Sequence, residues 1–160
     1  MKNLLIGGSS NLGNYILNSN KNNYDFTYFK KKIKDGIKFD LVNDNRNILR
    51  IENYKSVIIL SAISNPKICI ENKIYSQKVN VDSTIELIKY ASDKNVKIIF
   101  FSSEFIYDGN KGNYNENDDP NPINLYGEQK LQVENFIKKN VKNYSILRIA
   151  KTYTNSFEDN

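Results

Sequence analysis

Short apolar runs alternate along this chain with longer segments in which apolar residues recur at helical spacing. The runs are mostly β-branched or aromatic and are bounded by Asn, Asp, Lys or Ser, and they lie at residues 2–7, 24–29, 37–41, 56–60, 96–102 and 144–149. The runs at 56–60 and 96–102 are almost continuously hydrophobic, which is typical of strands in a parallel sheet that helices cover on both faces. The pattern therefore predicts a short strand at each run.

Other segments have the spacing of helices. Residues 12–18 follow the glycines that end the first run, and residues 124–139 follow Pro120 and Pro122, with Asn121 or Asn124 able to cap the helix. Residues 74–94 are too long for a strand, and their apolar positions are Ile74, Val81, Ile85, Ile88 and Ala91. The alternation of strand and helix predicts a doubly wound α/β fold, with a Rossmann-type parallel sheet in a three-layer α/β/α arrangement.

Length and composition agree with one folded unit. The chain has 160 residues, of which 39% are hydrophobic, and it contains no internal repeat or linker. Cys69 is the single cysteine, and no apolar run is long enough for a signal sequence or a membrane span, so we expect a cytoplasmic protein without membrane contact. The net charge of +5 is spread along the chain rather than gathered in a patch, which argues against a nucleic-acid partner.

Histidine is absent from the chain, and this restricts its chemistry. With no histidine and one cysteine, a conventional zinc site is excluded, and we expect no metal. Any acid-base catalysis has to use Tyr, Lys, Asp, Glu or Ser.

A glycine-containing turn, GGSSNLG at residues 7–13, separates the first predicted strand from the first predicted helix. At this place backbone amides and the helix N-terminus can bind a pyrophosphate, and Gly7 and Gly13 permit positive φ and close approach of the backbone. Taken alone, the turn is equally compatible with a loop that binds no ligand. It makes a nicotinamide dinucleotide a candidate cofactor.

The end of the second predicted strand bears on the choice of cofactor. Many NAD-binding domains have an acidic residue there, which binds the ribose hydroxyls, whereas this strand runs into Lys30, Lys31 and Lys32. A basic cluster suits a 2′-phosphate, so we favour NADPH over NADH, although lysine also occupies most surface turns of this chain. Asp40, at the end of the third predicted strand, either approaches the adenine or is an ordinary surface carboxylate.

Tyr126 and Lys130 lie four residues apart on the predicted helix 124–139 and therefore share a face. A nearby ammonium stabilises the phenolate and lowers the pKa of the phenol, which makes Tyr126 a usable proton donor. Ser103, at the carboxyl end of the fifth predicted strand, is where a hydroxyl can hydrogen-bond a substrate carbonyl beside the tyrosine. The alternative for the Tyr126 and Lys130 pair is a solvated helix face.

Several segments together resemble the extended short-chain dehydrogenases/reductases of the nucleotide-sugar group, and most closely the dTDP-4-dehydrorhamnose reductases. The segments are FSSEFIYDG at 101–109, PINLYGEQK at 122–130, LSAISNP at 60–66, KVNVDST at 78–84 and LRIAKTY at 147–153. The resemblance implies an NAD(P)H-dependent reduction of a 4-keto-6-deoxy sugar nucleotide. In it, Tyr126 donates the proton, Ser103 orients the carbonyl, and Lys130 binds the nicotinamide ribose and tunes the tyrosine.

The resemblance also implies which residues surround each ligand. The nucleotide-sugar substrate would meet Ser64, Ser103, Glu104 and Phe105. The cofactor site would comprise Gly7, Ser9, Ser10, Asn11, Leu12, Gly13, Lys30, Asp40, Leu41, Ser61, Ala62, Ile63, Asn80, Ser102, Tyr126 and Lys130. A homodimer through the helices 74–94 and 124–139 would also follow, unless their apolar faces pack on the sheet instead.

Particular residues separate the related families. Glu104 stands at the acidic position, which is usually Asp, and Phe105 follows it. The related 4,6-dehydratases have Asp and then Glu there, and the 4-epimerases usually have small residues, so both comparisons favour a reductase. Ser10 departs from the family's glycine pattern, because its Cβ stands where backbone usually meets the pyrophosphate.

The family pattern is also longer than this chain. Family members continue into a final Rossmann strand and a substrate-binding lobe, so we expect residues 1–150 to form the NAD(P)-binding domain and residues 151–160 to begin a lobe that is missing. The alternatives to a reductase are a sugar-nucleotide epimerase or dehydratase, a non-catalytic NAD(P)-binding regulatory module, and a gene fragment.

Overall fold

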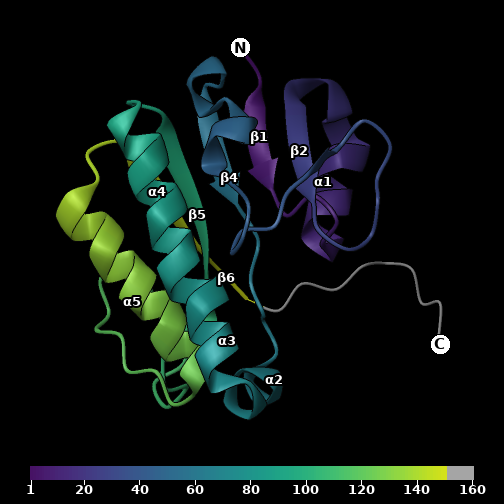
Figure 1. Cartoon of the computed structure of the whole chain (residues 1–160). Coiled ribbons are helices and arrows are strands. Elements are labelled where there is room, and N and C mark those ends of the chain that lie inside the picture. The colour runs from purple at the N-terminus through teal and green to yellow at the C-terminus, as the bar shows by residue number, and fades with distance from the viewer. Residues whose placement is uncertain (151–160) are drawn as a thin grey trace.

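The computed structural model describes residues 1–150, which contain one sheet of six parallel strands (Figure 1). The strands are β1 (Asn3–Ile6), β2 (Tyr24–Tyr28), β3 (Ile37–Lys38), β4 (Ser56–Ile59), β5 (Lys97–Ser103) and β6 (Tyr144–Ile149). Their order across the sheet is β3-β2-β1-β4-β5-β6. The doubly wound Rossmann fold is therefore confirmed. Its winding reverses between β1 and β4, where the carboxyl ends of neighbouring strands leave a crevice for a ligand.

Helices connect the strands, as the spacing predicts. They are α1 (Asn11–Asn20), α2 (Pro66–Glu71), α3 (Lys73–Gln77), α4 (Thr84–Asp93) and α5 (Leu125–Asn140). The predicted helix 74–94 consists of α3 and α4 joined by a π-helical turn, Lys78–Ser83. The periodicity does not predict α2, although Asn65 caps it and Pro66 occupies its first turn, which is a recognisable helix start. Within residues 1–150, no helix combines the length and the apolar composition that a membrane crossing requires.

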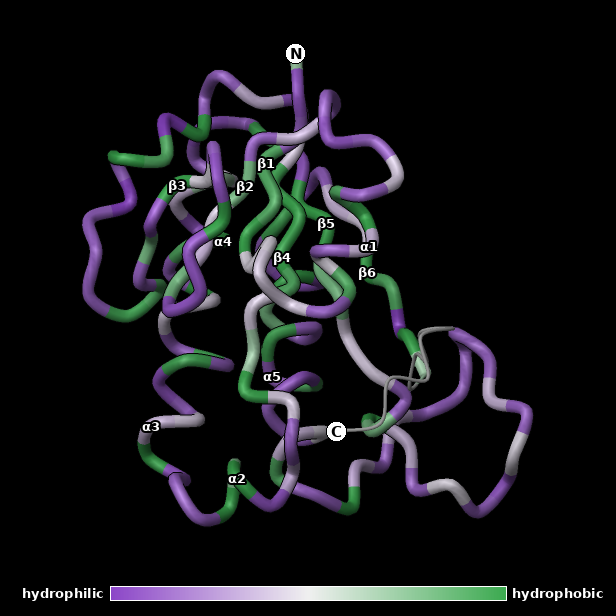
Figure 2. The backbone as a smooth tube through the Cα atoms, turned by 90° about the vertical axis from the view of Figure 1, so that its right-hand side faces the viewer, coloured by the Kyte–Doolittle hydropathy of each residue, from purple (hydrophilic) through white to green (hydrophobic). Residues whose placement is uncertain are grey.

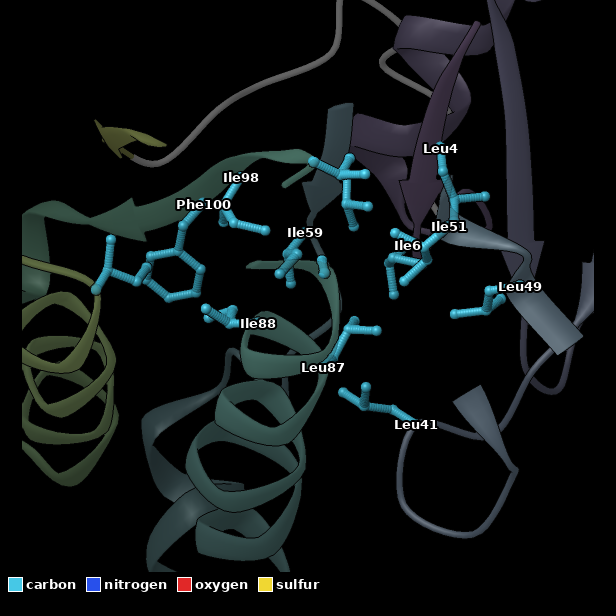
Figure 3. Packing of buried hydrophobic residues seen from close by; sticks show 14 of the residues in the cluster. Leu4, Ile6, Leu41, Leu49, Ile51, Ile59, Leu87, Ile88, Ile98 and Phe100 are labelled. Carbon is cyan, nitrogen blue, oxygen red and sulfur yellow. The ribbon is translucent and has the colours of Figure 1, made fainter. Parts of the chain in front are cut away.

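In β1, β4 and β5, successive residues enter hydrophobic clusters on opposite faces of the sheet. In β1, Leu4 and Ile6 pack in the cluster that contains α4 and α5, whereas Leu5 packs in the cluster that contains α1. Every residue of β4 is buried, as the continuous apolar run predicts. Figure 3 shows Leu87 and Ile88 of α4 among the strand residues, and Figure 2 shows apolar residues concentrated in the strands.

The apolar faces of α4 and α5 are used against the sheet. These two helices lie side by side on one face (Figure 1), and Leu87, Val133 and Ile137 are fully buried there. Packing on the sheet therefore accounts for their periodicity without a dimer interface. Ile74, the first apolar position of the predicted helix, is instead 90% exposed.

The face of the sheet on which α1 lies is only partly covered. Ile99 and Phe101 of β5 are partly buried on this side, and Leu147 of β6 is 43% exposed. α1 packs through Leu17 over β1, β2 and β4, and no helix among residues 1–150 lies over β5 and β6 here. Within residues 1–150, this face of β5 and β6 is therefore only partly buried.

A buried ion pair joins α5 to β6. Arg148 of β6 donates from Nε and Nη2 to the two carboxylate oxygens of Glu134, at 3.1 and 2.8 Å, and the Glu134 side chain is fully buried. Lys138 lies 3.3 Å from the same carboxylate. Burial alone would raise the pKa of Glu134, but the hydrogen bonds from Arg148 and the charges of Arg148 and Lys138 outweigh it and hold the pKa below its ordinary value.

Replacement of Glu134 by Gln should destabilise the fold, because Arg148 then lies largely buried without its counter-charge. We expect the free energy of unfolding at pH 7 to fall by about 3 to 5 kcal/mol in urea denaturation. The lowered pKa of Glu134 means that its contribution is present above the ordinary glutamate pKa and is lost as the pH falls through the folded-state value. The Glu134→Gln variant should therefore lose less stability on acidification than the wild type.

A matched control is Glu71→Gln, which removes an exposed pair with Lys67 one helical turn away. Because both side chains are solvated, this change should cost less than about 1 kcal/mol. Equal losses from Glu134→Gln and Glu71→Gln would contradict the assigned role of the buried pair.

Candidate active site

The turn at residues 7–13 follows β1 and is held in place by β2. Gly7 has φ +92°, and its amide donates to the Thr27 hydroxyl at 3.0 Å, while the Gly8 amide donates to the Thr27 carbonyl at 2.8 Å. A Cβ on Gly7 would lie 2.7 Å from Ser61 Oγ, and one on Gly13 would lie 2.7 Å from two carbonyl oxygens of the turn. Gly13 therefore serves the packing of α1 and lines no cavity described below. Thr27, which no motif singled out, fixes the position of the turn.

Ser10 caps α1 from the position that is glycine in the family pattern. Its hydroxyl donates to the Gly7 carbonyl at 2.8 Å and accepts from the Gly13 amide at 3.0 Å, so the hydroxyl is used within the turn. The amides of Asn11 and Leu12 have no acceptor within residues 1–150. They lie at the N-terminus of α1, where free amides and the helix dipole favour an anion.

A cavity of about 570 Å³ opens beside this turn and gathers most of the predicted cofactor residues. The predicted residues that line it are Gly7, Ser9, Ser10, Lys30, Asp40, Leu41, Ser61, Ala62 and Ile63. Its walls also include residues that no motif singled out, among them Thr27, Tyr28, Phe39, Ile68 and Tyr75. The cavity thus combines apolar and aromatic walls with polar atoms at the turn, as small-molecule sites do.

Asp40 lines this first cavity with its carboxylate already hydrogen-bonded. It accepts from the Val42 amide at 2.9 Å and from the Asn43 side chain at 2.8 Å. Burial would raise the pKa of Asp40, but these hydrogen bonds outweigh it and keep the pKa below its ordinary value. The carboxylate is therefore ionised at neutral pH and shapes the turn after β3.

A second cavity, of about 610 Å³, brings the predicted catalytic residues together: Ser103 from the end of β5, and Tyr126 and Lys130 from α5. It is also lined by the predicted substrate residues Ser64, Glu104 and Phe105, and by Asn11, Leu12 and Ser102 of the predicted cofactor set. Ser10 and Ala62 line both cavities. The two cavities therefore adjoin in the crevice between β1 and β4.

Close packing against a 3-10 turn, Glu104–Ile106, fixes the start of α5. Asn124 caps α5 by accepting from the Gly127 amide at 2.9 Å, which confirms one of the two predicted caps. A Cβ on Gly127 would lie 2.0 Å from the Phe105 carbonyl oxygen, so this approach requires glycine. The rings of Phe105 and Tyr126 then meet edge to face, with centroids 6.0 Å apart.

Lys130 is only 3% exposed, and its ammonium donates to the Phe101 carbonyl at 2.8 Å. The nitrogen lies 4.6 Å from the centroid of the Phe100 ring and 5.7 Å from that of the Tyr126 ring. Burial lowers the pKa of Lys130 to about 8, and the charge of Glu134 offsets part of this effect. Lys130 therefore lies beside the Tyr126 ring, and its ammonium is fixed by the hydrogen bond that it donates to the backbone of β5.

The expected lowering of the Tyr126 pKa is not found in this structure. Burial, together with the charges of Cys69 and Glu104, raises the pKa of Tyr126 to about 12. The physical reason is that a phenolate in this buried place would lose most of its hydration, and the neighbouring negative charges disfavour it further. The phenol therefore keeps its proton at neutral pH.

Asn80, which the resemblance assigns to the cofactor site, lines neither cavity. It is 2% exposed, and its side chain bonds the backbone of Ile63 twice. Its Oδ1 accepts from the Ile63 amide at 2.7 Å, and its Nδ2 donates to the Ile63 carbonyl at 3.0 Å. Because Ile63 lines the first cavity, Asn80 acts on that cavity through the loop and not by contact.

The predicted second lobe falls outside the described residues, and the prediction about a metal concerns residues within them. The end of the motif LRIAKTY and the predicted start of a second lobe, at 151–160, lie outside the described residues. Among residues 1–150, no group of three or more His, Cys, Asp or Glu is arranged to hold a metal ion.

This chain is similar in sequence to a known protein family and to curated proteins. The family described as the RmlD substrate binding domain matches residues 1–160. Methionine adenosyltransferase 2 subunit beta of Bos taurus is 32% identical over 97 residues, which cover 61% of this chain and 29% of that relative. The family match agrees with the resemblance that the motifs indicate.

Solved structures share the fold. A hypothetical dTDP-4-dehydrorhamnose reductase from Sulfolobus tokodaii has a TM-score of 0.84 and 27% identity, covering 94% of this chain and 56% of that chain. The dTDP-4-dehydrorhamnose reductase of Bacillus anthracis in complex with NADP has a TM-score of 0.73 over 94% of this chain and 54% of that one, and its 21% identity shows the fold alone. This chain spans about half the length of these structures and less than a third of the curated relative.

The buried ammonium of Lys130 should make stability depend on pH. Its folded-state pKa of about 8 is lower than the ordinary 10.5, so the unfolded chain binds this proton more tightly and stability should rise as the pH increases from about 8 to 10.5. The rise should amount to at most about 3 kcal/mol. Lys130→Met should remove it.

Urea denaturation of the wild type and the Lys130→Met variant from pH 7 to 10 checks this prediction. The difference between the two profiles isolates the lysine, because every other ionisable side chain is present in both proteins. Parallel profiles would show that Lys130 is not desolvated in the folded protein.

Proposed function

We propose, from the premise that this chain belongs to the RmlD substrate binding domain family, that it carries the cofactor-binding and proton-donating part of a nucleotide-sugar reductase. Its substrate class is a 4-keto-6-deoxy sugar nucleotide, and its cofactor is NADPH. The observation that carries the proposal is the second cavity, where Ser103, Tyr126 and Lys130 meet beside the start of α1. Residues 1–150 form the NAD(P)-binding domain in this proposal.

The residues of the two adjoining cavities fit a nicotinamide dinucleotide. The turn at 7–13 has no room for a side chain at Gly7, and the Asn11 and Leu12 amides remain available for a pyrophosphate. The aromatic walls of the first cavity, including Tyr28 and Tyr75, suit the flat adenine. The reduced nicotinamide, when bound, supplies a hydride to the keto carbon of the substrate.

The chain's own residues then complete the reduction. Tyr126 donates its hydroxyl proton to the carbonyl oxygen, so that the ketone becomes a secondary alcohol. The Ser103 hydroxyl donates to Glu104 Oε2 at 3.1 Å in the ligand-free structure, and in this proposal it turns its hydrogen to the substrate oxygen and orients it. Lys130, whose nitrogen lies 5.7 Å from the centre of the tyrosine ring, stabilises the phenolate that remains.

A second candidate function is a cofactor-binding subunit that acts on another enzyme and has no turnover of its own. The curated relative, methionine adenosyltransferase 2 subunit beta, supports this alternative by its role as a subunit. Both candidates require the first cavity to bind a dinucleotide, but only the reductase requires the Tyr126 hydroxyl. NADPH binding without reduction of any 4-keto-6-deoxy sugar nucleotide would favour the subunit.

The preference for NADPH rests on the end of β2. This strand ends at Tyr28 and continues into Phe29 and Lys30, with no carboxylate there to bind the ribose hydroxyls. Lys30 lines the first cavity. Lys30→Ala should therefore weaken NADPH binding roughly tenfold and leave NADH binding within about twofold in isothermal titration calorimetry, because only NADPH carries the 2′-phosphate.

Lys32→Ala is the control for this change, since it removes a nearby lysine that does not line the cavity. It should leave both affinities unchanged. An equal loss of affinity for NADPH and NADH in the Lys30→Ala variant would show that the preference is wrong.

Tyr126→Phe should lower turnover of a 4-keto-6-deoxy sugar nucleotide about 10²- to 10⁴-fold, because the ring stays and only the proton donor is removed. NADPH affinity should stay the same. The loss of NADPH absorbance measures turnover, and Tyr90→Phe is the control, since the Tyr90 hydroxyl bonds Asn47 at an exposed site. Full turnover in the Tyr126→Phe variant would rule out the proposed proton donor.

A further inference from the structure

A series of buried side-chain hydrogen bonds leads from α5 to its neighbours. Gln129 of α5 is fully buried, and its Oε1 accepts from Asn80 Nδ2 at 2.7 Å. Its Nε2 donates to the Ser76 hydroxyl at 3.0 Å, and this hydroxyl in turn donates to the Cys69 carbonyl at 3.0 Å. Both ends of the Gln129 amide are therefore satisfied by residues of other helical segments, as a buried amide requires.

Asn80 carries this connection on to the loop at residues 60–65. Its amide group has two hydrogens, and they go to the Ile63 carbonyl at 3.0 Å and to Gln129 Oε1 at 2.7 Å. Its oxygen accepts from the Ile63 amide at 2.7 Å. Gln129 and Ile63 together fix the Asn80 side chain, and a bond lost in this buried place costs more than one at the surface.

The two ends of this connection line different cavities. Ile63 lines the first cavity, while Tyr126 and Lys130, the nearest cavity-lining residues of α5, line the second. Gln129 lines neither. We propose that Gln129 is a positioning residue. It couples the ordering of the loop at residues 60–65 to the position of Tyr126, the proposed proton donor on α5. The identity of the ligand in this inference rests on the proposed function.

Gln132 provides a matched control on the same helix. Its Oε1 accepts from Gln77 Nε2 of α3 at 3.0 Å, at an exposed site. Like Gln129, it therefore bonds α5 to α3, although as acceptor rather than donor, and among residues 1–150 it makes no bond to the loop at 60–65.

Hydrogen–deuterium exchange of the full chain, with and without NADPH, tests the inference in Gln129→Met and Gln132→Met. Without NADPH, Gln129→Met should speed exchange of the Ile63 amide about tenfold, and Gln132→Met should leave it unchanged. With NADPH, the wild type and Gln132→Met should exchange more slowly both in the loop and in residues 128–133. Gln129→Met should show slower exchange in the loop alone.

Each result decides a separate question. If Gln129→Met matched Gln132→Met with and without NADPH, the coupling role would be overturned while the proposed function stood. If NADPH slowed exchange in neither segment of the wild type, the proposed cofactor would fail, and the ligand-free comparison would still decide whether Gln129 holds the loop. Should Gln129→Met not fold, Ser76→Ala removes the hydroxyl that accepts from the Gln129 amide, together with its bond to the Cys69 carbonyl, and roughly threefold faster exchange at Ile63 is then expected.

Discussion

The burial of Lys130 is the constraint on which the rest of the site depends. Lys130 is 3% exposed, so its ammonium has lost most of its hydration. The Phe101 carbonyl and the face of the Phe100 ring replace the lost water molecules. Both replacements come from β5, so α5 has to lie close against the strand that ends in Ser103. The pairing of strand and helix that satisfies the lysine is therefore the same pairing that brings Ser103 and Tyr126 to one cavity.

Three positions of α5 connect the helix to three different parts of the fold. Gly127 permits contact with the turn after β5, Gln129 reaches the loop after β4 through Asn80, and Glu134 binds β6 through Arg148. These contacts lie along two turns of one helix and restrain it in different directions. A proton donor gains from such restraint, because proton transfer requires the reacting atoms to be held in a narrow range of positions.

Features that depend on interactions between residues close in sequence could be predicted from the sequence, and features that depend on distant residues could not. The continuous run at 56–60 became the buried strand β4, and Asn124 became a cap, because hydrophobic period and capping act over a few residues. The meeting of Ser103, Tyr126 and Lys130 at one cavity also agrees with the sequence pattern, since parallel strands end at one edge. The raised pKa of Tyr126 and the indirect role of Asn80 could not be predicted, because they depend on burial and on partners distant in sequence.

Capping and packing explain several residues of the segment PINLYGEQK. They do not explain the Tyr126 hydroxyl. Asn124 caps the helix, Gly127 provides room for the neighbouring turn, and Gln129 satisfies buried polar groups. The Tyr126 hydroxyl differs from them, because it has no hydrogen-bond partner within residues 1–150 although the residue is only 7% exposed. The residue lines the second cavity, where its hydroxyl is open to solvent or a ligand, and a phenylalanine would fill the buried part of this place equally well. A hydroxyl that packing does not require, and that lies in the same cavity as Ser103, supports the proposed role of Tyr126 as proton donor.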